Sequence, residues 1–107
     1  MVTSRFDIWL VNLDPTVGSE MQKTRPCLIV SPDDLNLEIR TVIVAPLTSA
    51  GKIYSYRTAC LFQRRNGWVA LDQLRTVDKS RLQKRLGRIE VATQKAVLAI
   101  LAEMFAE

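Results

Sequence analysis

Histidine is missing from this sequence of 107 residues, and cysteine occurs only twice, as Cys27 and Cys60. Protein zinc sites are built mainly from His and Cys ligands at short spacings, and neither cysteine has such a neighbour. We therefore expect no zinc site, no other metal and no cofactor. Both cysteines lie inside apolar, strand-like runs, which favours two buried free thiols in a reducing cytosol over a disulfide.

Long hydrophobic runs are scarce as well. The longest uninterrupted one, Ala96 to Ala102, is much too short to cross a bilayer. Near the N-terminus, Arg5 is followed by a short apolar run that Asn12 interrupts, which is unlike a signal peptide. We therefore expect a cytoplasmic protein without a membrane segment.

What the chain does contain is typical of one folded domain over residues 1–107. Hydrophobic residues make up 48% of it and charged residues 24%, a balance that indicates a globular rather than a disordered chain. A chain of this length buries about two-thirds of its unfolded surface without disulfides or metals. No internal repeat, low-complexity tract or linker divides the sequence.

Positive charge is concentrated in one segment. Between Arg64 and Arg88, eight Lys and Arg residues stand against Asp72 and Asp78, a net charge of +6, while the whole chain carries +4. Such a segment favours a polyanionic partner such as nucleic acid. A solvated face, or a docking surface for an acidic protein, accounts for the charge equally well.

Short runs of β-branched and large apolar residues, bounded by turn formers, predict five or six strands. A polar loop that begins near Asp14 separates the first two, and Gly18 within it is expected to adopt a backbone conformation that other residues resist. A helical turn is expected after Pro32, and Asp78 or Ser80 is suited to cap another. The expected strands are residues 8–13, 27–30, 40–47, 56–62, 67–71 and 86–89.

The C-terminal segment has the periodicity of a helix. Thr93 is suited to cap this helix, and apolar residues then recur at three- and four-residue spacing, as Val97, Ile100, Leu101, Met104 and Phe105. Such a stripe is typical of core packing. We therefore expect a mainly β fold (α+β) closed by a C-terminal helix, with the strands in a small, strongly bent barrel that hides their edges.

Four motifs follow one another along the chain: DIWLVNLDPTVGSE from Asp7, TRPCLIVSP from Thr24, APLTS from Ala45 and VALDQLRTVD from Val69. In this order and spacing they resemble the MazF/PemK (Kid) family of type II toxins, from about Phe6 to the C-terminal helix. The resemblance implies an SH3-like small β-barrel that forms a homodimer. It also implies a sequence-specific endoribonuclease that cuts single-stranded RNA without a metal and is held inactive by a cognate antitoxin.

The resemblance also assigns site residues. The Arg of the TRP motif is Arg25 and the Thr of the PLTS-type motif is Thr48, which are the usual catalytic pair. The resemblance further implies that the ribose 2′-hydroxyl attacks the phosphate, as in this family, and that the products carry a 2′,3′-cyclic phosphate and a 5′-hydroxyl end. This chain departs from the Kid branch at Ser19, where that branch has His, and at Ala70, where it has Arg. The residues implied to bind substrate are Glu20, Thr24, Ser49, Asp72 and Gln73.

The available residue types limit how such a reaction can proceed. A histidine pair, the familiar acid and base near neutral pH, is excluded because the chain has no histidine. The guanidinium of Arg25 is suited to grip two phosphate oxygens, but it keeps its proton up to a pH above about 12 and is a poor base. Thr48 is suited to donate a hydrogen bond to the phosphate. Glu20 or Asp72 would accept a proton only if burial raised its pKa, so the base stays open.

Structural interpretations of the same residues stay open at this stage. Arg25 paired with Glu20 would pin the loop, and Thr48 would satisfy a backbone group. Trp9 fits the core or a dimer interface better than a base-stacking platform. Phe62 is a candidate to stack on an unpaired base.

Two rival functions share the implied fold. A gyrase-poisoning toxin of the CcdB type acts by binding a protein, but such toxins end in a short tail with Trp, whereas this chain ends EMFAE. The second rival is a barrel that binds RNA or an antitoxin without cutting, against which the presence of both Arg25 and Thr48 argues. The recognised RNA sequence depends on the loops over residues 18–23 and 48–55, and the sequence does not reveal it.

Overall fold

The computed structural model describes residues 1–49 and 55–107, so most of the expected loop over residues 48–55 lies outside the described residues. The strands pair antiparallel in one sheet with the order β4-β5-β3-β2-β1-β7, and β6 pairs with β3 beside this path. The strands are β1 (Asp7–Asn12), β2 (Thr24–Ile29), β3 (Thr41–Thr48), β4 (Arg57–Phe62), β5 (Arg65–Ala70), β6 (Arg75–Asp78) and β7 (Leu82–Arg88).

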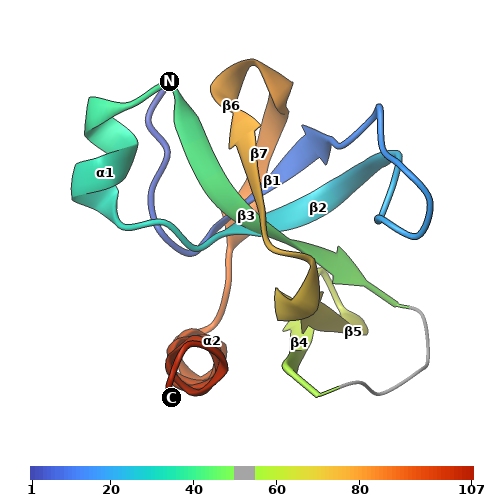
Figure 1. Cartoon of the computed structure of the whole chain (residues 1–107), viewed down its shortest axis with the longest axis vertical. Helices are drawn as coiled ribbons and strands as arrows, with labels where there is room; N and C mark the ends of the chain where they lie inside the picture. The colour runs from blue at the N-terminus through green and yellow to red at the C-terminus, as the bar shows by residue number, and fades with distance from the viewer. Residues whose placement is uncertain (50–54) are drawn as a thin grey trace.

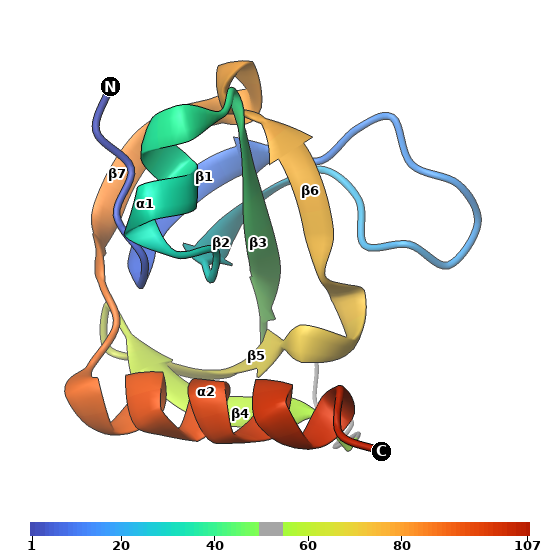
Figure 2. The same ribbon diagram turned by 60° about the vertical axis from the view of Figure 1, so that its left-hand side comes forward.

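The sheet is curled but forms only a half-barrel. It does not close, because the strands at the two ends of its path, β4 and β7, do not pair with each other in the described part of the chain. Helix α2 (Val91–Met104) lies across β4 and β5, whereas α1 (Asp33–Glu38) lies at the other end of the half-barrel, before β3 (Figures 1 and 2). The predicted mainly β fold with a C-terminal helix is confirmed. No described helix is both long and apolar enough to span a membrane.

Two hydrophobic clusters occupy the two faces of the curled sheet. Alternate residues of β1 contribute to each: Ile8 packs with Leu28 in the cluster that includes Val97 of α2, and Trp9 packs with Cys27 in the other. Side chains alternate between the faces of a strand, so a strand buried on both faces has a near-continuous apolar sequence. This is why the β1 run shows no polar alternation.

Several element boundaries differ from the sequence-based prediction. β2 begins three residues earlier, at Thr24, and therefore contains the TRP motif. β5 begins at Arg65 because the turn before it contains only Gln63 and Arg64, both with left-handed φ (50° and 63°), which is the geometry of a two-residue hairpin. β7 begins at Leu82, four residues before the predicted start. Two irregularities in its register with β1 obscure the alternation in its sequence, which is why the prediction missed this part of the strand.

The predictions for the helical ends were correct in part. Asp78 caps the short helix η2 (Lys79–Arg81) by accepting a hydrogen bond from the Ser80 amide at 2.8 Å, as expected. The prediction that Thr93 caps α2 was wrong, because Glu90 is the cap residue and Thr93 lies within the helix, where it is buried. Phe105 follows the helix and is 73% exposed, so it does not extend the packed stripe.

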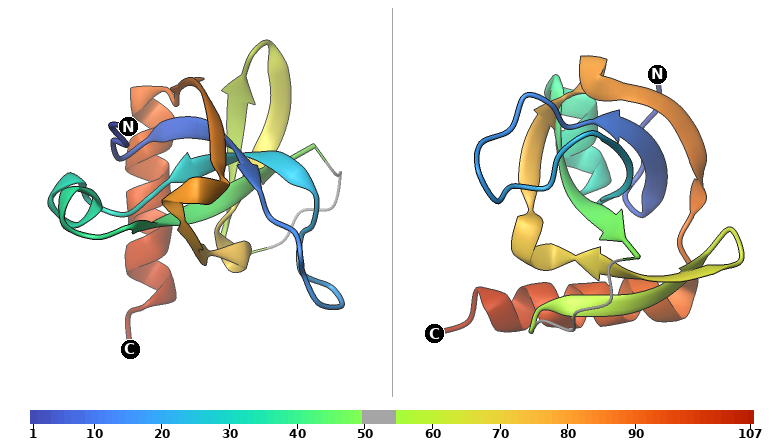
Figure 3. Two further views of the ribbon diagram at one scale, coloured as in Figure 1. Left: turned by 90° about the horizontal axis from the view of Figure 1, so that it is seen from above. Right: turned by 90° about the vertical axis from the view of Figure 1, so that its right-hand side faces the viewer.

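The loop between β1 and β2 extends away from the body of the sheet (Figure 3). Gly18 in this loop has a φ of +56°, as expected for a position that favours glycine. Arg75 anchors the start of the loop by donating a hydrogen bond to the carbonyl oxygen of Leu13 at 2.5 Å. The loop is therefore tied to the sheet next to the strand that carries the TRP motif.

Candidate functional site

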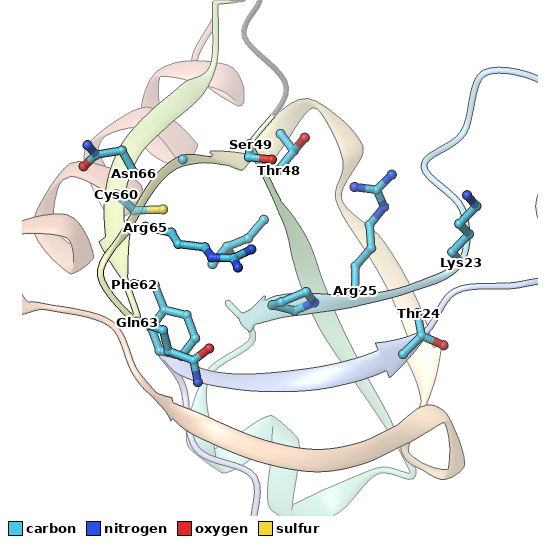
Figure 4. Close-up of a pocket in the computed structure, with 13 residues that line it drawn as sticks. Lys23, Thr24, Arg25, Thr48, Ser49, Cys60, Phe62, Gln63, Arg65 and Asn66 are labelled. Atoms are coloured by element: carbon cyan, nitrogen blue, oxygen red, sulfur yellow. The ribbon is translucent and has the colours of Figure 1, made fainter.

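A pocket of about 680 Å³ lies between β2, the end of β3 and the β4–β5 hairpin. Three cationic side chains line it, Lys23, Arg25 and Arg65, and no Asp or Glu is among its described lining residues. Figure 4 shows Arg25 and Arg65 reaching into the same hollow from different strands. Because uncompensated positive charge in a concave site attracts anions, the pocket is suited to a polyanion.

Arg25 and Thr48 are brought together by strand pairing. The register that pairs Cys27 with Pro46 places Arg25 opposite Thr48 when it is continued for two residues towards the strand ends. Arg25 is partly exposed, and its Nε donates to the carbonyl oxygen of Gln22 at 2.9 Å. Its guanidinium extends along the pocket towards Thr48 (Figure 4). An anion bound in the pocket therefore meets both side chains.

Thr48 is fixed at the end of β3 by its neighbour strand. It pairs with Trp68 of β5 and is only 7% exposed. Gly67, the residue before Trp68 in β5, lies so close to Thr48 that a Cβ atom at Gly67 would be 2.8 Å from the carbonyl oxygen of Thr48. Only glycine allows this approach of the two backbones, so Gly67 sets the position of Thr48 in the pocket wall.

Arg65 is a pocket residue that sequence reasoning missed. It was counted only as part of the basic segment, since β5 was expected to begin two residues later. The tight turn at Gln63 and Arg64 instead pairs Arg65 with Phe62, and both line the pocket. A two-residue turn recognised in the sequence would have been the signal. Phe62, a predicted stacking residue, thus has an apolar ring in the pocket wall.

The seven predicted site residues divide into two groups. Thr24 and Ser49 are exposed and line the pocket of Arg25 and Thr48. The other three, Glu20, Asp72 and Gln73, do not line it; they line a second pocket of about 230 Å³. One short segment borders both pockets, because residues 20 and 21 line the second and residues 23–25 the first. The two pockets are therefore neighbours along the chain.

The carboxylates that were candidate bases have other partners. Glu20 accepts a hydrogen bond from the amide of Val17 at 2.6 Å within its own loop and does not pair with Arg25 in the described structure. Asp72 accepts two hydrogen bonds from Arg57, at 2.8 and 3.1 Å. These bonds lower the pKa of Asp72 below its usual value. The condition for Asp72 to act as a base, a raised pKa, is not met.

Both cysteines are free and buried, as predicted. Burial raises the pKa of the Cys27 thiol to about 12, and it also raises the pKa of the Cys60 thiol, which borders the pocket. Both are therefore protonated thiols at neutral pH.

Trp9 is 8% exposed in the second hydrophobic cluster, in agreement with its predicted core position. Among the described residues, no three Cys, Asp or Glu side chains converge as metal ligands.

The fold and the site together define a small β half-barrel whose strand ends carry a cationic pocket suited to a polyanion. Comparison with known proteins gives the family. Residues 4–105 match the model of the PemK-like, MazF-like toxin of type II toxin–antitoxin systems. The chain belongs to this family, as the motifs indicated.

Individual relatives agree with this assignment. The chain is 41% identical to the Endoribonuclease PemK of Escherichia coli over 92% of its own length and 78% of the relative. It is 30% identical to the Endoribonuclease EndoA of Bacillus subtilis over 84% and 83%. The crystal structure of MazF (Form-I) from Deinococcus radiodurans has the same fold, with a TM-score of 0.85 at 24% identity over 97% and 96% of the two chains. A mycobacterial endoribonuclease in complex with its cognate antitoxin superimposes with a TM-score of 0.79 at 24% identity over 94% and 92%.

Proposed function

We propose that this protein is the toxin of a type II toxin–antitoxin pair, a sequence-specific endoribonuclease that cuts single-stranded RNA without a metal at the pocket of Arg25 and Thr48. The observation that carries the proposal is the joint placement of these two residues in a cationic pocket of a chain from this family. The relatives named as endoribonucleases support the activity.

The reaction begins when the 2′-oxygen of a ribose attacks the adjacent phosphorus. The bond from phosphorus to the 5′-oxygen of the next nucleotide then breaks. The products are a 2′,3′-cyclic phosphate, formed with loss of the 2′-hydroxyl proton, and a 5′-hydroxyl, formed by gain of a proton. Neither a metal nor a water nucleophile attacks the phosphorus in this step, so the protein's task is to orient the RNA and stabilise the extra negative charge on the phosphorane.

Arg25 supplies most of that stabilisation. Its guanidinium donates to phosphate oxygens with a fixed fork, and the charge it offers is not neutralised by a described carboxylate in the pocket. Thr48 donates its hydroxyl to the same phosphate from the opposite strand. Thr24 and Ser49 bind the RNA backbone beside them, while Glu20, Asp72 and Gln73 bind a neighbouring nucleotide in the second pocket.

Deprotonation of the 2′-hydroxyl is assigned to solvent hydroxide, which becomes water. A solvent water then protonates the departing 5′-oxygen and regenerates hydroxide. No described lining residue of the pocket has an ordinary pKa between about 5 and 8, and burial keeps Cys60 protonated. Glu20 and Asp72 belong to the second pocket. Catalysis then consists of positioning and charge stabilisation rather than general-base transfer, and its rate follows the hydroxide concentration.

The partners follow from the same surface. The cognate antitoxin covers the pocket with an acidic, extended segment that pairs with Lys23, Arg25 and Arg65. The toxin acts in the cytoplasm as a homodimer, in which each copy contributes one such pocket.

The test is incubation of purified, antitoxin-free protein with a long single-stranded RNA in EDTA, followed by mapping of the cut ends. Discrete cuts with 5′-hydroxyl ends are expected, and they also reveal the recognised sequence. If the folded dimer leaves the RNA intact, the nuclease proposal is refuted, and binding to gyrase and to RNA should then be measured.

A further inference from the structure

A chain of polar contacts links β4 to the β1–β2 loop. Arg57 of β4 donates from Nε and Nη2 to the two carboxylate oxygens of Asp72, at 2.8 and 3.1 Å. The side-chain amide of Gln73 donates to Asp72 at 3.4 Å, and the oxygen of that amide accepts from the Met21 backbone at 3.4 Å. Three segments far apart in the sequence are thus joined by side chains.

The sheet geometry makes the first of these contacts possible. Arg57 pairs with Ala70 across β4 and β5, and Asp72 lies two residues beyond Ala70, in the short helix η1 (Leu71–Gln73). Diagonal positions of this kind lie within reach of long side chains, and the small side chain of Ala70 does not obstruct the guanidinium. The side chain of Arg57 is only 7% exposed, so its orientation is held by packing.

The contact chain ends on the segment that borders both pockets. Met21 lies between Glu20 of the second pocket and Lys23 of the first. Arg75 and Arg81 hold the start of the loop through the carbonyl oxygens of residues 12–14, whereas the Gln73 contact holds the other end of the loop at Met21. The Gln73 contact therefore fixes the distance between the second pocket and the phosphate site at Arg25.

We propose that Arg57 is a positioning residue for RNA cleavage, which acts through Asp72 and Gln73 to hold the second pocket in register with Arg25. Arg57 itself lines neither pocket, so it contributes nothing directly to the phosphorane. Its effect falls on binding of the nucleotide beside the scissile phosphate, before the chemical step. This inference rests on the proposed ribonuclease function and adds a residue to it.

The experiment measures KM and kcat on a short single-stranded RNA that carries the main cut site mapped with the wild-type protein. We expect Arg57→Gln to raise KM about tenfold and to change kcat by less than about twofold, because loss of binding before the chemical step raises KM alone. Arg57→Lys keeps the charge but loses the fork, so an intermediate rise of about threefold is expected. Arg40→Gln makes the same change of side chain at an exposed arginine that lines neither pocket, and it is the control for the loss of one positive charge, with KM unchanged.

A double-mutant cycle shows whether the residues act as a pair. Asp72→Asn is expected to raise KM by a similar factor, and the double variant by no more than either single one. If folded Arg57→Gln keeps the wild-type KM, or if the two effects multiply, the proposal is wrong. If Arg57→Gln does not fold at the assay temperature, Arg57→Lys decides, because an unchanged KM in that folded variant also refutes the proposal. Wild-type protein that fails to cut the RNA refutes the ribonuclease function instead.

Discussion

Gly67→Ala tests whether the backbone position of Thr48 controls the rate. The added Cβ would lie 2.8 Å from the Thr48 carbonyl oxygen, whereas an ordinary C···O contact is about 3.3 Å. The strands β3 and β5 must therefore separate by about 0.5 Å at this point. The atoms that this Cβ would meet are the carbonyl oxygen and carbonyl carbon of Thr48, which both belong to the backbone. No side-chain rotation therefore relieves the clash.

The expected effect on the rate follows from this displacement. A misplacement of 1 Å in an active site costs roughly 10²-fold, so a shift of half that size lowers kcat about tenfold. Over-packing costs about 1–3 kcal/mol, and the gain from replacing a strand glycine by alanine offsets about 0.5–1 kcal/mol of it. The net loss of folding stability is therefore about 0–2.5 kcal/mol.

The assay combines cleavage kinetics on the mapped RNA site with urea unfolding. Val77→Ala is the control, since it removes two methyl groups from the second hydrophobic cluster and lowers stability by about 2 kcal/mol without touching the pocket. This control is expected to keep the wild-type kcat. A folded Gly67→Ala variant with an unchanged kcat would refute the argument that the contact with β5 places Thr48 for catalysis.

Three further predictions follow from the site and from the thiols. Arg25→Ala is expected to lower the cleavage rate by about 10²- to 10³-fold with little change in the urea midpoint, because it removes a donor to developing charge from the open end of β2. The rate constant kcat/KM should rise about tenfold per pH unit between about pH 6 and 8, and a bell-shaped profile would instead reveal a protein base. Burial raises the pKa of Cys27 from 9.0 to about 12 in the folded protein. The contribution of the protonated thiol to folding stability is therefore complete below pH 9 and is lost as the pH rises towards 12. Urea unfolding between pH 8 and 10.5 should show the start of this decline, and a free energy of unfolding that does not change with pH would contradict it.

The boundary between what sequence reasoning found and what it missed follows the range of the interactions involved. β1 and β2 were predicted because their apolar runs are local, and the four motifs are local as well. β7 was mostly missed, since its residues are polar and its pairing with β1 is irregular. Thr93 was misassigned as a helix cap because capping depends on where the backbone turns, and the turn occurs at Glu90.

The sequence by itself determined the class of fold, the family and the residue types available for chemistry, with no histidine among them. These properties depend on composition and on short-range patterns, which can be read along one chain. Only the tertiary structure decided that the predicted site residues divide between two pockets, that Arg65 enters the first, and that Arg57 holds Asp72 past the small Ala70. The position of Arg65 follows from the local two-residue turn at Gln63 and Arg64. The other two facts arise from cross-strand pairing between distant residues, and such a register is set by the packing of the whole sheet rather than by any local pattern.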